Sequence, residues 1–303
     1  MRHVLGVDAG GTKSRALLAT ERGEIVASAS AGGANLRTHG ELEVEKVLHA
    51  LAEEVSAAAG ARADAVAAGI AGAGRPDDEA LLREILRRIG FRERVVVTND
   101  AHIAFVAGSP GRVGLALVCG TGSIAWGCNG AGEVARAGGW GWHVGDEGSG
   151  VWIGERAIRQ VLRARDGRGP STSLEGALLE HFAIPRVEEV VPAIYDRDFP
   201  RHRVALFAVA VERAALAGDG VSARILEDAA DELVLAAATV VRRLGLASSS
   251  YDVVLSGGTF RALPTLEQNV ARRLASPGAN VRRLEEEPAL GAVRLAIEEL
   301  RRP

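Results

Sequence analysis

The stretch VLGVDAGGTKSRALLA, from Val4 to Ala19, decides the fold. An apolar run reaches Asp8, the chain turns through two glycines, and a second apolar run begins after Lys13. Two such runs around a short glycine turn predict a β-hairpin. Glycine turns after strands also bind phosphate, because their bare backbone N–H groups approach the anion closely. We therefore expect a phosphate-binding hairpin at the start of the chain.

The surroundings of this turn exclude two common phosphate motifs. A Rossmann fingerprint needs a helix directly after its glycines, whereas residues 15–20 predict a strand. A Walker A motif needs a second glycine before its lysine, but Thr12 stands at that position. A plain β-hairpin with no ligand remains an alternative for a single turn of this kind.

The same arrangement then occurs a second time. Residues 113–119 predict a buried strand, GTG at 120–122 a turn, and residues 123–128 and 133–137 two further strands. A third glycine turn lies in VVLSGGTFRA at 253–262, again after a β-branched run. Three such turns, two of them opening matching meanders, favour phosphate binding over a plain hairpin.

Between the glycine turns, strands alternate with helices. Strands are predicted at 64–71 and 95–98, and helices at 41–59, 77–90, 151–165, 173–182, 203–217, 221–245 and 288–301. This alternation predicts the α/β class. We expect two similar α/β domains, residues 1–112 and 113–287, that grip a nucleotide from both sides of a cleft.

Composition excludes several functions. Of the 303 residues 47% are hydrophobic, and the net charge of −3 gives no basic patch for nucleic acid or an anionic membrane. No apolar run is long enough to span a membrane, and no signal peptide precedes the first strand. Two cysteines, Cys119 and Cys128, make neither a disulfide framework nor a zinc pattern. We expect a cytoplasmic protein.

The motifs resemble those of the sugar kinase/actin/chaperone ATPase superfamily. DAGGTKS (8–14) and VCGTGSIAWG (118–127) resemble its two phosphate motifs, and VVLSGGTF (253–260) resembles its adenosine motif. TNDAHIAF (98–105) and PALGAVRLA (288–296) resemble the segments that meet at its interdomain hinge. Within it, GGWGWHVGDEGSGVWIG (138–154) resembles the N-acetylglucosamine kinase branch of the BadF/BadG/BcrA/BcrD-type ATPase family.

This resemblance implies a fold and a reaction. The fold is two ribonuclease H-like, actin/hexokinase-like α/β domains around an ATP and sugar cleft, with segment 288–303 returning to the first domain. The reaction is ATP-dependent phosphorylation of an amino sugar, with ATP and Mg²⁺ as cofactors and N-acetylglucosamine 6-phosphate as the expected product. A homodimer is also implied.

Two acids have a chemical role and a structural alternative. A carboxylate must accept the proton of the sugar hydroxyl, and the resemblance makes Asp100 this catalytic base; alternatively, Asp100 or Asn99 only caps the next helix. Asp8 repels phosphate unless Mg²⁺ lies between them, so Asp8 is predicted to hold Mg²⁺ through water. Its alternative is a turn-forming aspartate.

The remaining site residues follow from the resemblance. The sugar is expected against Asn35, Asp100, Gly139, Trp140, Gly141 and Asp146. The nucleotide is expected against Gly10, Gly11, Thr12, Lys13, Gly120, Thr121, Gly122, Gly218, Gly257 and Gly258. Loop and capping chemistry is the alternative for the acids of GDEGSG (145–150), and a helix C-cap is the alternative for Gly218.

Three rival functions stay open. The same chemistry fits glucosamine, N-acetylmuramic acid or N-acetylmannosamine. A second rival is the ATPase activator of a 2-hydroxyacyl-CoA dehydratase or benzoyl-CoA reductase, in which cysteines of a dimer hold an iron–sulfur cluster. Cys119 and Cys128 both end predicted strands, which disfavours this rival. A non-catalytic sugar sensor is the third, and the intact Asp8, Thr121 and Asp100 disfavour it.

Overall fold

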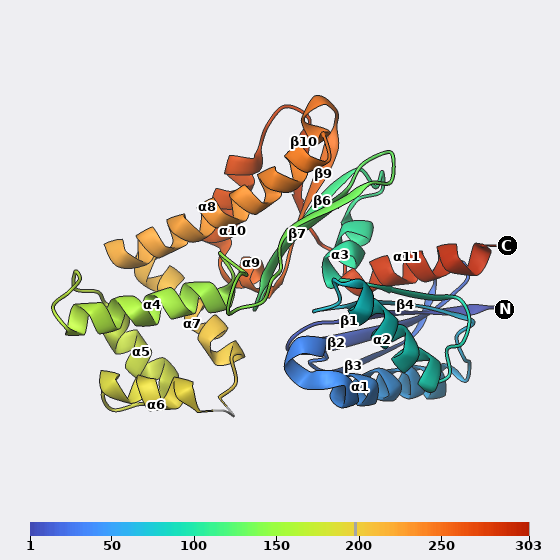
Figure 1. Ribbon diagram of the computed structural model, residues 1–303, viewed down its shortest axis with the longest axis horizontal. Coiled ribbons are helices and arrows are strands. Elements are labelled where there is room, and N and C mark those ends of the chain that lie inside the picture. The colour runs from blue at the N-terminus through green and yellow to red at the C-terminus, as the bar shows by residue number, and fades with distance from the viewer. Residues whose placement is uncertain (197–198, 303) are drawn as a thin grey trace.

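The computed structural model describes residues 1–196 and 199–302, and its first sheet contains the meander predicted from the sequence (Figure 1). This sheet has the order β3-β2-β1-β4-β5 and consists of β1 (His3–Ala9), β2 (Lys13–Thr20), β3 (Ile25–Gly32), β4 (Ala65–Ile70) and β5 (Val95–Thr98). Strands β1, β2 and β3 are antiparallel neighbours, whereas β4 pairs in parallel with both β1 and β5.

A second sheet repeats this topology strand for strand. It consists of β6 (Gly114–Cys119), β7 (Ser123–Cys128), β8 (Val134–Gly138), β9 (Tyr251–Ser256) and β10 (Ala279–Arg283). Its order is β8-β7-β6-β9-β10, with an antiparallel meander and two parallel strands. The predicted fold class, two similar ribonuclease H-like α/β units, is confirmed.

Helices cover both faces of the first sheet. They are α1 (Leu36–Ala59), α2 (Pro76–Arg88), α3 (Asp100–Gly108) and α11 (Pro288–Arg301). Side chains alternate along β1, so Leu5 and Val7 pack with α1 and α2, whereas Val4 packs with α3 and α11. Although α11 ends the chain, it lies on the first sheet, where Figure 1 shows it in red. A Cβ on Gly6 would lie 2.5 Å from the backbone nitrogen of Val293, so glycine is needed for this close packing.

The second sheet carries a larger set of helices. Between β8 and β9 lie α4 (Gly150–Arg165), α5 (Leu174–Phe182), α6 (Val190–Tyr195), α7 (His202–Leu216) and α8 (Gly220–Arg243). Between β9 and β10 lie α9 (Gly258–Ala262) and α10 (Pro264–Leu274). Short 3₁₀ helices occupy Val187–Glu189 and Leu246–Ser248. Most of these helices share one core with the face of the sheet that carries Leu115, Leu117 and Ala125.

Helix α3 joins the two units because it contacts both sheets. On the second sheet, Phe105 packs with Ala116 and Trp126 in a separate apolar cluster. The ring of His102 stacks on the indole of Trp126, with 4.2 Å between the ring centroids. Helices α3 and α11 also pack against each other, so the two segments that the resemblance brings together do lie side by side.

The structure extends the sequence prediction in two places. Helix α1 begins at Leu36, five residues earlier than expected, because Asn35 caps one short turn before the chain kinks at Gly40 (φ 78°). Helix α9, helix α10 and strand β10 were not predicted, because a glycine turn and a short polar segment hide their periodicity. These three elements complete the repeat of the first sheet.

Candidate active site

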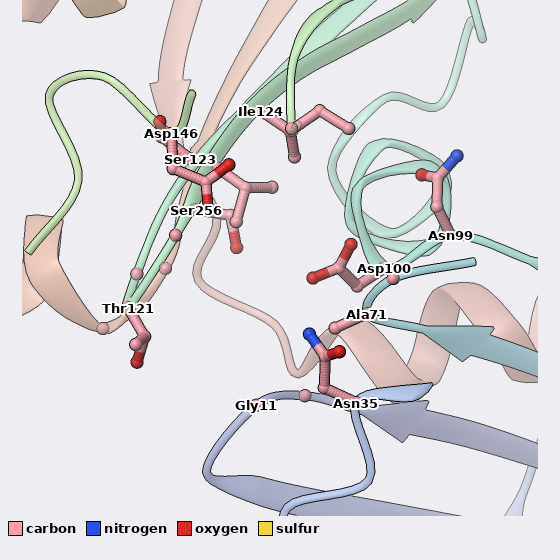
Figure 2. A pocket seen from close by; sticks show the side chains of 18 of the residues that line it. Gly11, Asn35, Ala71, Asn99, Asp100, Thr121, Ser123, Ile124, Asp146 and Ser256 are labelled. Atoms are coloured by element: carbon pink, nitrogen blue, oxygen red, sulfur yellow. The ribbon is translucent and has the colours of Figure 1, made fainter. Parts of the chain in front are cut away.

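A cleft of about 1770 Å³ lies between the two sheets, at the ends of their central strands. Figure 2 shows side chains of both units turned toward this space. Nearly all the residues predicted from the sequence line it: Asp8, Gly10, Gly11, Thr12, Lys13, Asn35, Asp100, Gly120, Thr121, Gly122, Gly139, Trp140, Gly141, Asp146, Gly257 and Gly258.

The two glycine turns present unused hydrogen-bond donors to the cleft. Each turn is closed by a backbone bond, from Gly10 N to the Lys13 carbonyl at 3.0 Å and from Gly120 N to the Gly122 carbonyl at 2.8 Å. Within the described residues, the N–H groups of Thr12 and Thr121 donate to no protein group, and neither do their hydroxyls. Free backbone N–H groups and hydroxyls in a glycine turn suit a phosphate group.

The third glycine turn packs directly on the second. The hydroxyl of Thr259 donates to the carbonyl of Gly120 at 2.7 Å. Gly257 has a φ of 116°, and a Cβ there would lie 2.1 Å from the carbonyl oxygen of Cys119. Only glycine fits this position, so the adenosine-type turn and the second phosphate turn form one rigid surface.

Asp100 is the first residue of α3, and it is not the helix cap. The side chain of Asn99 is the cap, because its oxygen accepts from the backbone N–H of His102 at 2.8 Å. The carboxyl group of Asp100 accepts from Ala101 N at 3.0 Å and points into the cleft (Figure 2). Burial raises the pKa of Asp100 above its ordinary value, although hydrogen bonds from Ala101 and its own backbone oppose this. A partly buried carboxylate with a raised pKa is a better proton acceptor at neutral pH.

Asp8 lies near the end of β1, and its carboxyl group faces the cleft. Burial raises its pKa to about 7, and the nearby Asp100 adds to the effect, whereas Arg261 and Lys13 oppose it. No hydrogen bond in the described part of the chain involves its carboxyl group, so the turn-forming interpretation gains no support. A partly buried carboxylate without a hydrogen-bond partner favours a cation beside it.

Asp146 binds the loop before α4 to the second phosphate turn. Its carboxyl accepts from Gly141 N at 3.1 Å, and a Cβ on Gly122 would lie 2.5 Å from its other oxygen. The cap of α4 is Ser149, whose hydroxyl accepts from Trp152 N at 3.3 Å. Burial raises the pKa of Asp146 to about 6, and the charges of Glu147 and Asp100 contribute. Backbone hydrogen bonds from Gly141 and Ser123 lower this pKa, so Asp146 links the loop before α4 to the second phosphate turn at the wall of the cleft.

The amide of Asn35 is oriented by its capping bond. The oxygen of Asn35 accepts from Arg37 N at 2.9 Å. Its nitrogen is the end of the side chain that points into the cleft, toward the Asp100 side (Figure 2). Asn35 is thus presented to a ligand as a hydrogen-bond donor, a restriction that the sequence does not reveal.

Gly218 does not line the cleft in this structure. It follows α7 with a φ of 94°, its N–H donates to the Ala215 carbonyl at 3.0 Å, and Asp219 N donates to the Ala214 carbonyl at 3.0 Å. These bonds are those of a left-handed helix C-cap, the alternative recognised from the sequence. Its contact with the nucleotide stays a prediction.

Two arginines of the cleft were not singled out from the sequence. Arg261 lines the cleft just after the adenosine-type turn, and its charge lowers the pKa of Asp8. Its place in the motif VVLSGGTFRA could have identified it from the sequence. Arg136 lies in β8, and its guanidinium stacks over the half-exposed indole of Trp140 at 4.2 Å from the ring centroid. Nothing in the local sequence marks Arg136, because its place depends on strand pairing.

The two cysteines lie at opposite ends of the β6–β7 hairpin. Cys119 is fully buried and pairs with Ser123, whereas Cys128 pairs with Gly114 five residues farther along the strands. Five residues of strand span about 17 Å. Burial also raises the pKa of both thiols. One iron–sulfur cluster therefore cannot take both cysteines of a chain as ligands.

Other classes of site find no support in the described residues. No group of three or more His, Cys, Asp or Glu side chains is placed there to hold a metal by protein ligands alone. None of the helices described is long and apolar enough to cross a membrane.

Comparison with known proteins relates the whole chain to one family. Residues 5–296 match the model of the BadF/BadG/BcrA/BcrD ATPase family. The chain is 33% identical, over 99% of both chains, to an N-acetylmuramic acid/N-acetylglucosamine kinase of Clostridium acetobutylicum. It is 29% identical, over 97% of both, to an N-acetyl-D-glucosamine kinase of Dictyostelium discoideum. A crystal structure of a Chromobacterium violaceum protein shares the fold with a TM-score of 0.78 and 24% identity, over 98% of this chain and 99% of that one.

Proposed function

The chain belongs to the BadF/BadG/BcrA/BcrD ATPase family, and from this membership we propose that it is an ATP-dependent amino-sugar kinase. The proposed substrate is N-acetylglucosamine, phosphorylated on its 6-hydroxyl. Two full-length relatives carry the names of kinases for N-acetylated amino sugars. The fold places a phosphate-type turn from each unit on either side of one cleft.

One observation carries the proposal: Asp100 is free for catalysis because Asn99 caps α3 in its place. The carboxylate accepts the proton of the sugar hydroxyl while that oxygen attacks the γ-phosphorus and the bond to ADP breaks. Its burial favours this proton transfer, because desolvation makes the carboxylate more basic. The first turn of α3 fixes the carboxyl at the edge of the cleft, which supplies orientation.

The phosphate chain of ATP would lie between the two glycine turns. Donors from Thr12 in the first turn and Thr121 in the second approach it from opposite sides. Such donors stabilise the charge that is spread over the phosphoryl oxygens during transfer. Lys13 adds a positive charge at the first turn.

Mg²⁺ is part of the proposal, with Asp8 as the residue that would hold it through water. The chemistry of the site fits, because Mg²⁺ in kinases takes one or two carboxylates and obtains its other ligands from phosphates and water. The partly buried Asp8 carboxyl has a pKa of about 7 and no hydrogen-bond partner among the described residues. When bound, the ion would neutralise phosphate charge.

The direction of the Asn35 amide favours an N-acetylated sugar over glucosamine. Its oxygen is already bound to Arg37 N, so it offers donors to a ligand. A donor suits a hydroxyl or acetamido oxygen but opposes an ammonium group, which is itself only a donor. The half-exposed indole of Trp140 adds an apolar surface that suits a methyl group.

The test is a coupled assay of ADP release with ATP and a panel of sugars. We expect kcat/KM for N-acetylglucosamine to exceed that for glucosamine by at least about tenfold, and glucose to be poorer still. Asn35→Ala should reduce the gap. A preference for glucosamine would contradict the choice of sugar, and ATP hydrolysis without any sugar product would contradict the kinase proposal.

The positions of the two cysteines disfavour the alternative function as an ATPase activator. The proposal also includes the domain limits, a homodimer and a cytoplasmic location. The domain limits are 1–112 with 288–303, and 113–287. The buried contacts of α11 with the first sheet support the return of the C-terminal segment; residues 197–198 and 303 lie outside the described residues. A homodimer and a cytoplasmic location are likewise predictions, for which solution scattering and cell fractionation are the direct measurements.

A further inference from the structure

Arg136 is a cation on the cleft face of the second sheet. It lies in β8 directly opposite Trp126 of β7, and both side chains line the cleft. Paired residues of neighbouring antiparallel strands project from the same face. Arg136 therefore lies on the face that α3 covers, away from the large core on the other side of the sheet.

The guanidinium group of Arg136 has its N–H donors unused. Its central carbon lies over the Trp140 ring, 4.2 Å from the ring centroid, and this contact engages none of its N–H groups in a hydrogen bond. In residues 1–196 and 199–302, no ion pair or hydrogen bond involves these groups. By contrast, the guanidinium of Arg37, at the same end of the cleft, binds both carboxyl oxygens of Asp78 at 2.5 and 2.6 Å.

A short loop of the first unit places Arg136 near Asn35. A Cβ on Gly74 would lie 3.2 Å from a terminal nitrogen of Arg136, and a Cβ on Gly72 would lie 2.9 Å from the side-chain oxygen of Asn35. Two residues of chain span at most about 7 Å. Arg136 and Asn35 therefore lie beside the same short loop and line the same part of the cleft.

Arg136 is also displaced from the expected path of the phosphates. In β8, Gly138 pairs with Ile124, the second residue after the Gly120–Gly122 turn. Arg136 pairs with Trp126, two residues farther from that turn. An anion bound by Arg136 would thus belong to the sugar and not to ATP. A neutral sugar offers no charged partner to this guanidinium.

Resting on the proposed function, we infer that Arg136 is a specificity-determining residue that binds an acidic substituent of the amino sugar. The substrate class then extends to N-acetylated amino sugars that carry a carboxylate, with N-acetylmuramic acid as the example. A guanidinium pairs with a carboxylate through two parallel N–H···O bonds, which gives both affinity and orientation. The cation–π contact with Trp140 helps to hold the guanidinium in place.

The experiment compares kcat/KM for N-acetylmuramic acid and N-acetylglucosamine at saturating ATP, in the full chain and three variants. Arg136→Met should lower the ratio of the two values at least tenfold, since hydrogen bonds to charged groups are strong. Arg136→Lys should keep part of the ratio, because it keeps the charge but not the fork. Arg75→Met removes another arginine that lines this end of the cleft and should leave the ratio within about threefold.

Each other outcome overturns the inference. If the parent phosphorylates N-acetylglucosamine but not N-acetylmuramic acid, the acidic subsite is wrong while the proposed kinase function stands. If Arg136→Met lowers both values equally, or if Arg75→Met changes the ratio as much, Arg136 has no selective role. If neither sugar is phosphorylated, the kinase function and the inference fail together.

Discussion

The two central strands, β1 and β6, have the same place in two sheets of the same topology, yet they bring different chemistry to the cleft. Each ends in a glycine turn that lines the cleft. The next-to-last residue is the acid Asp8 in β1 and the apolar Val118 in β6, and both line the cleft. The duplication therefore repeats the phosphate turn but not the carboxylate. Topology fixes where a ligand lies, whereas side chains decide which half carries charge.

The loops after the two meanders differ more. Each loop ends at a helix N-cap, Asn35 before α1 and Ser149 before α4. The first loop is only three residues long, 33–35, whereas the second runs from 139 to 149 and carries Trp140 and Asp146. The second unit thus contributes most of the predicted sugar contacts. The halves agree where phosphate is expected and diverge where a sugar is expected.

The largest effects are expected when one cleft carboxylate is removed from each unit, Asp100 from the first and Asp146 from the second. Asp100→Asn should lower kcat by roughly 10²–10⁴, the usual contribution of a positioned base, with sugar affinity within about tenfold. Asp146→Asn should act mainly on the KM for the sugar. Steady-state kinetics and calorimetry on both variants measure these effects. Near-normal turnover in Asp100→Asn would show that it is not the base.

A control separates the cap from the base. Asn99→Ala removes the cap of α3 and should lower the free energy of unfolding by about 0.5–2 kcal/mol. Its kcat should fall far less than that of Asp100→Asn. Equal losses of kcat in the two variants would mean that the start of α3 matters only as a structural element.

The difference between Asp8 and Val118 is tested at the ends of the central strands. Asp8→Asn should lower kcat/KM for ATP by roughly 10- to 100-fold, as expected for a group that holds a metal through water, and higher Mg²⁺ should restore part of it. Val118→Ala is the matched change in β6 and should have little effect on the dependence on Mg²⁺. An unchanged Mg²⁺ dependence in Asp8→Asn would contradict the assignment of the metal to the first half.

The two phosphate turns are expected to contribute alike. Thr12→Val and Thr121→Val each remove one hydroxyl that is free in the described structure, and each should raise the KM for ATP by roughly tenfold. The KM for the sugar should change far less in both. A loss confined to one variant would show that ATP is bound from one side only, and an equal loss for ATP and sugar would indicate a defect of the fold.

The smallest expected effect is on the free energy of unfolding. It tests the raised pKa of Asp8 in the protein without any ligand. Burial raises its pKa from 3.8 to about 7. The unfolded chain releases this proton near pH 4 and the folded chain only near pH 7, so the stability it contributes is lost as pH rises through that window. Asp8→Asn stays neutral. Relative to the parent, it should gain at least about 1.4 kcal/mol in the free energy of unfolding between pH 5 and pH 8, measured by urea denaturation. A difference that does not change with pH would contradict the raised pKa.

The amino-acid sequence alone determined the duplicated architecture. Period-two apolar runs and glycine turns are local signals, so both meanders and their phosphate turns follow from short stretches around Asp8 and Thr121. The sequence predicted the element boundaries less accurately and did not predict the segment from α9 to β10. Those elements are short, and packing determines their conformation. Gly218 does not line the cleft in this structure, and its predicted contact with the nucleotide stays a prediction.

Only the tertiary structure decided the roles of individual side chains. The choice between Asn99 and Asp100 as the cap of α3 depends on which carbonyl group reaches the N–H of His102, and adjacent residues in the sequence look equally suitable. The raised pKa values come from burial between elements that are far apart in the chain. Arg136 meets Gly74 across the cleft although 61 residues separate them. Charge, desolvation and hydrogen-bond capacity are properties of surroundings in space, and those surroundings exist only once the two sheets face each other.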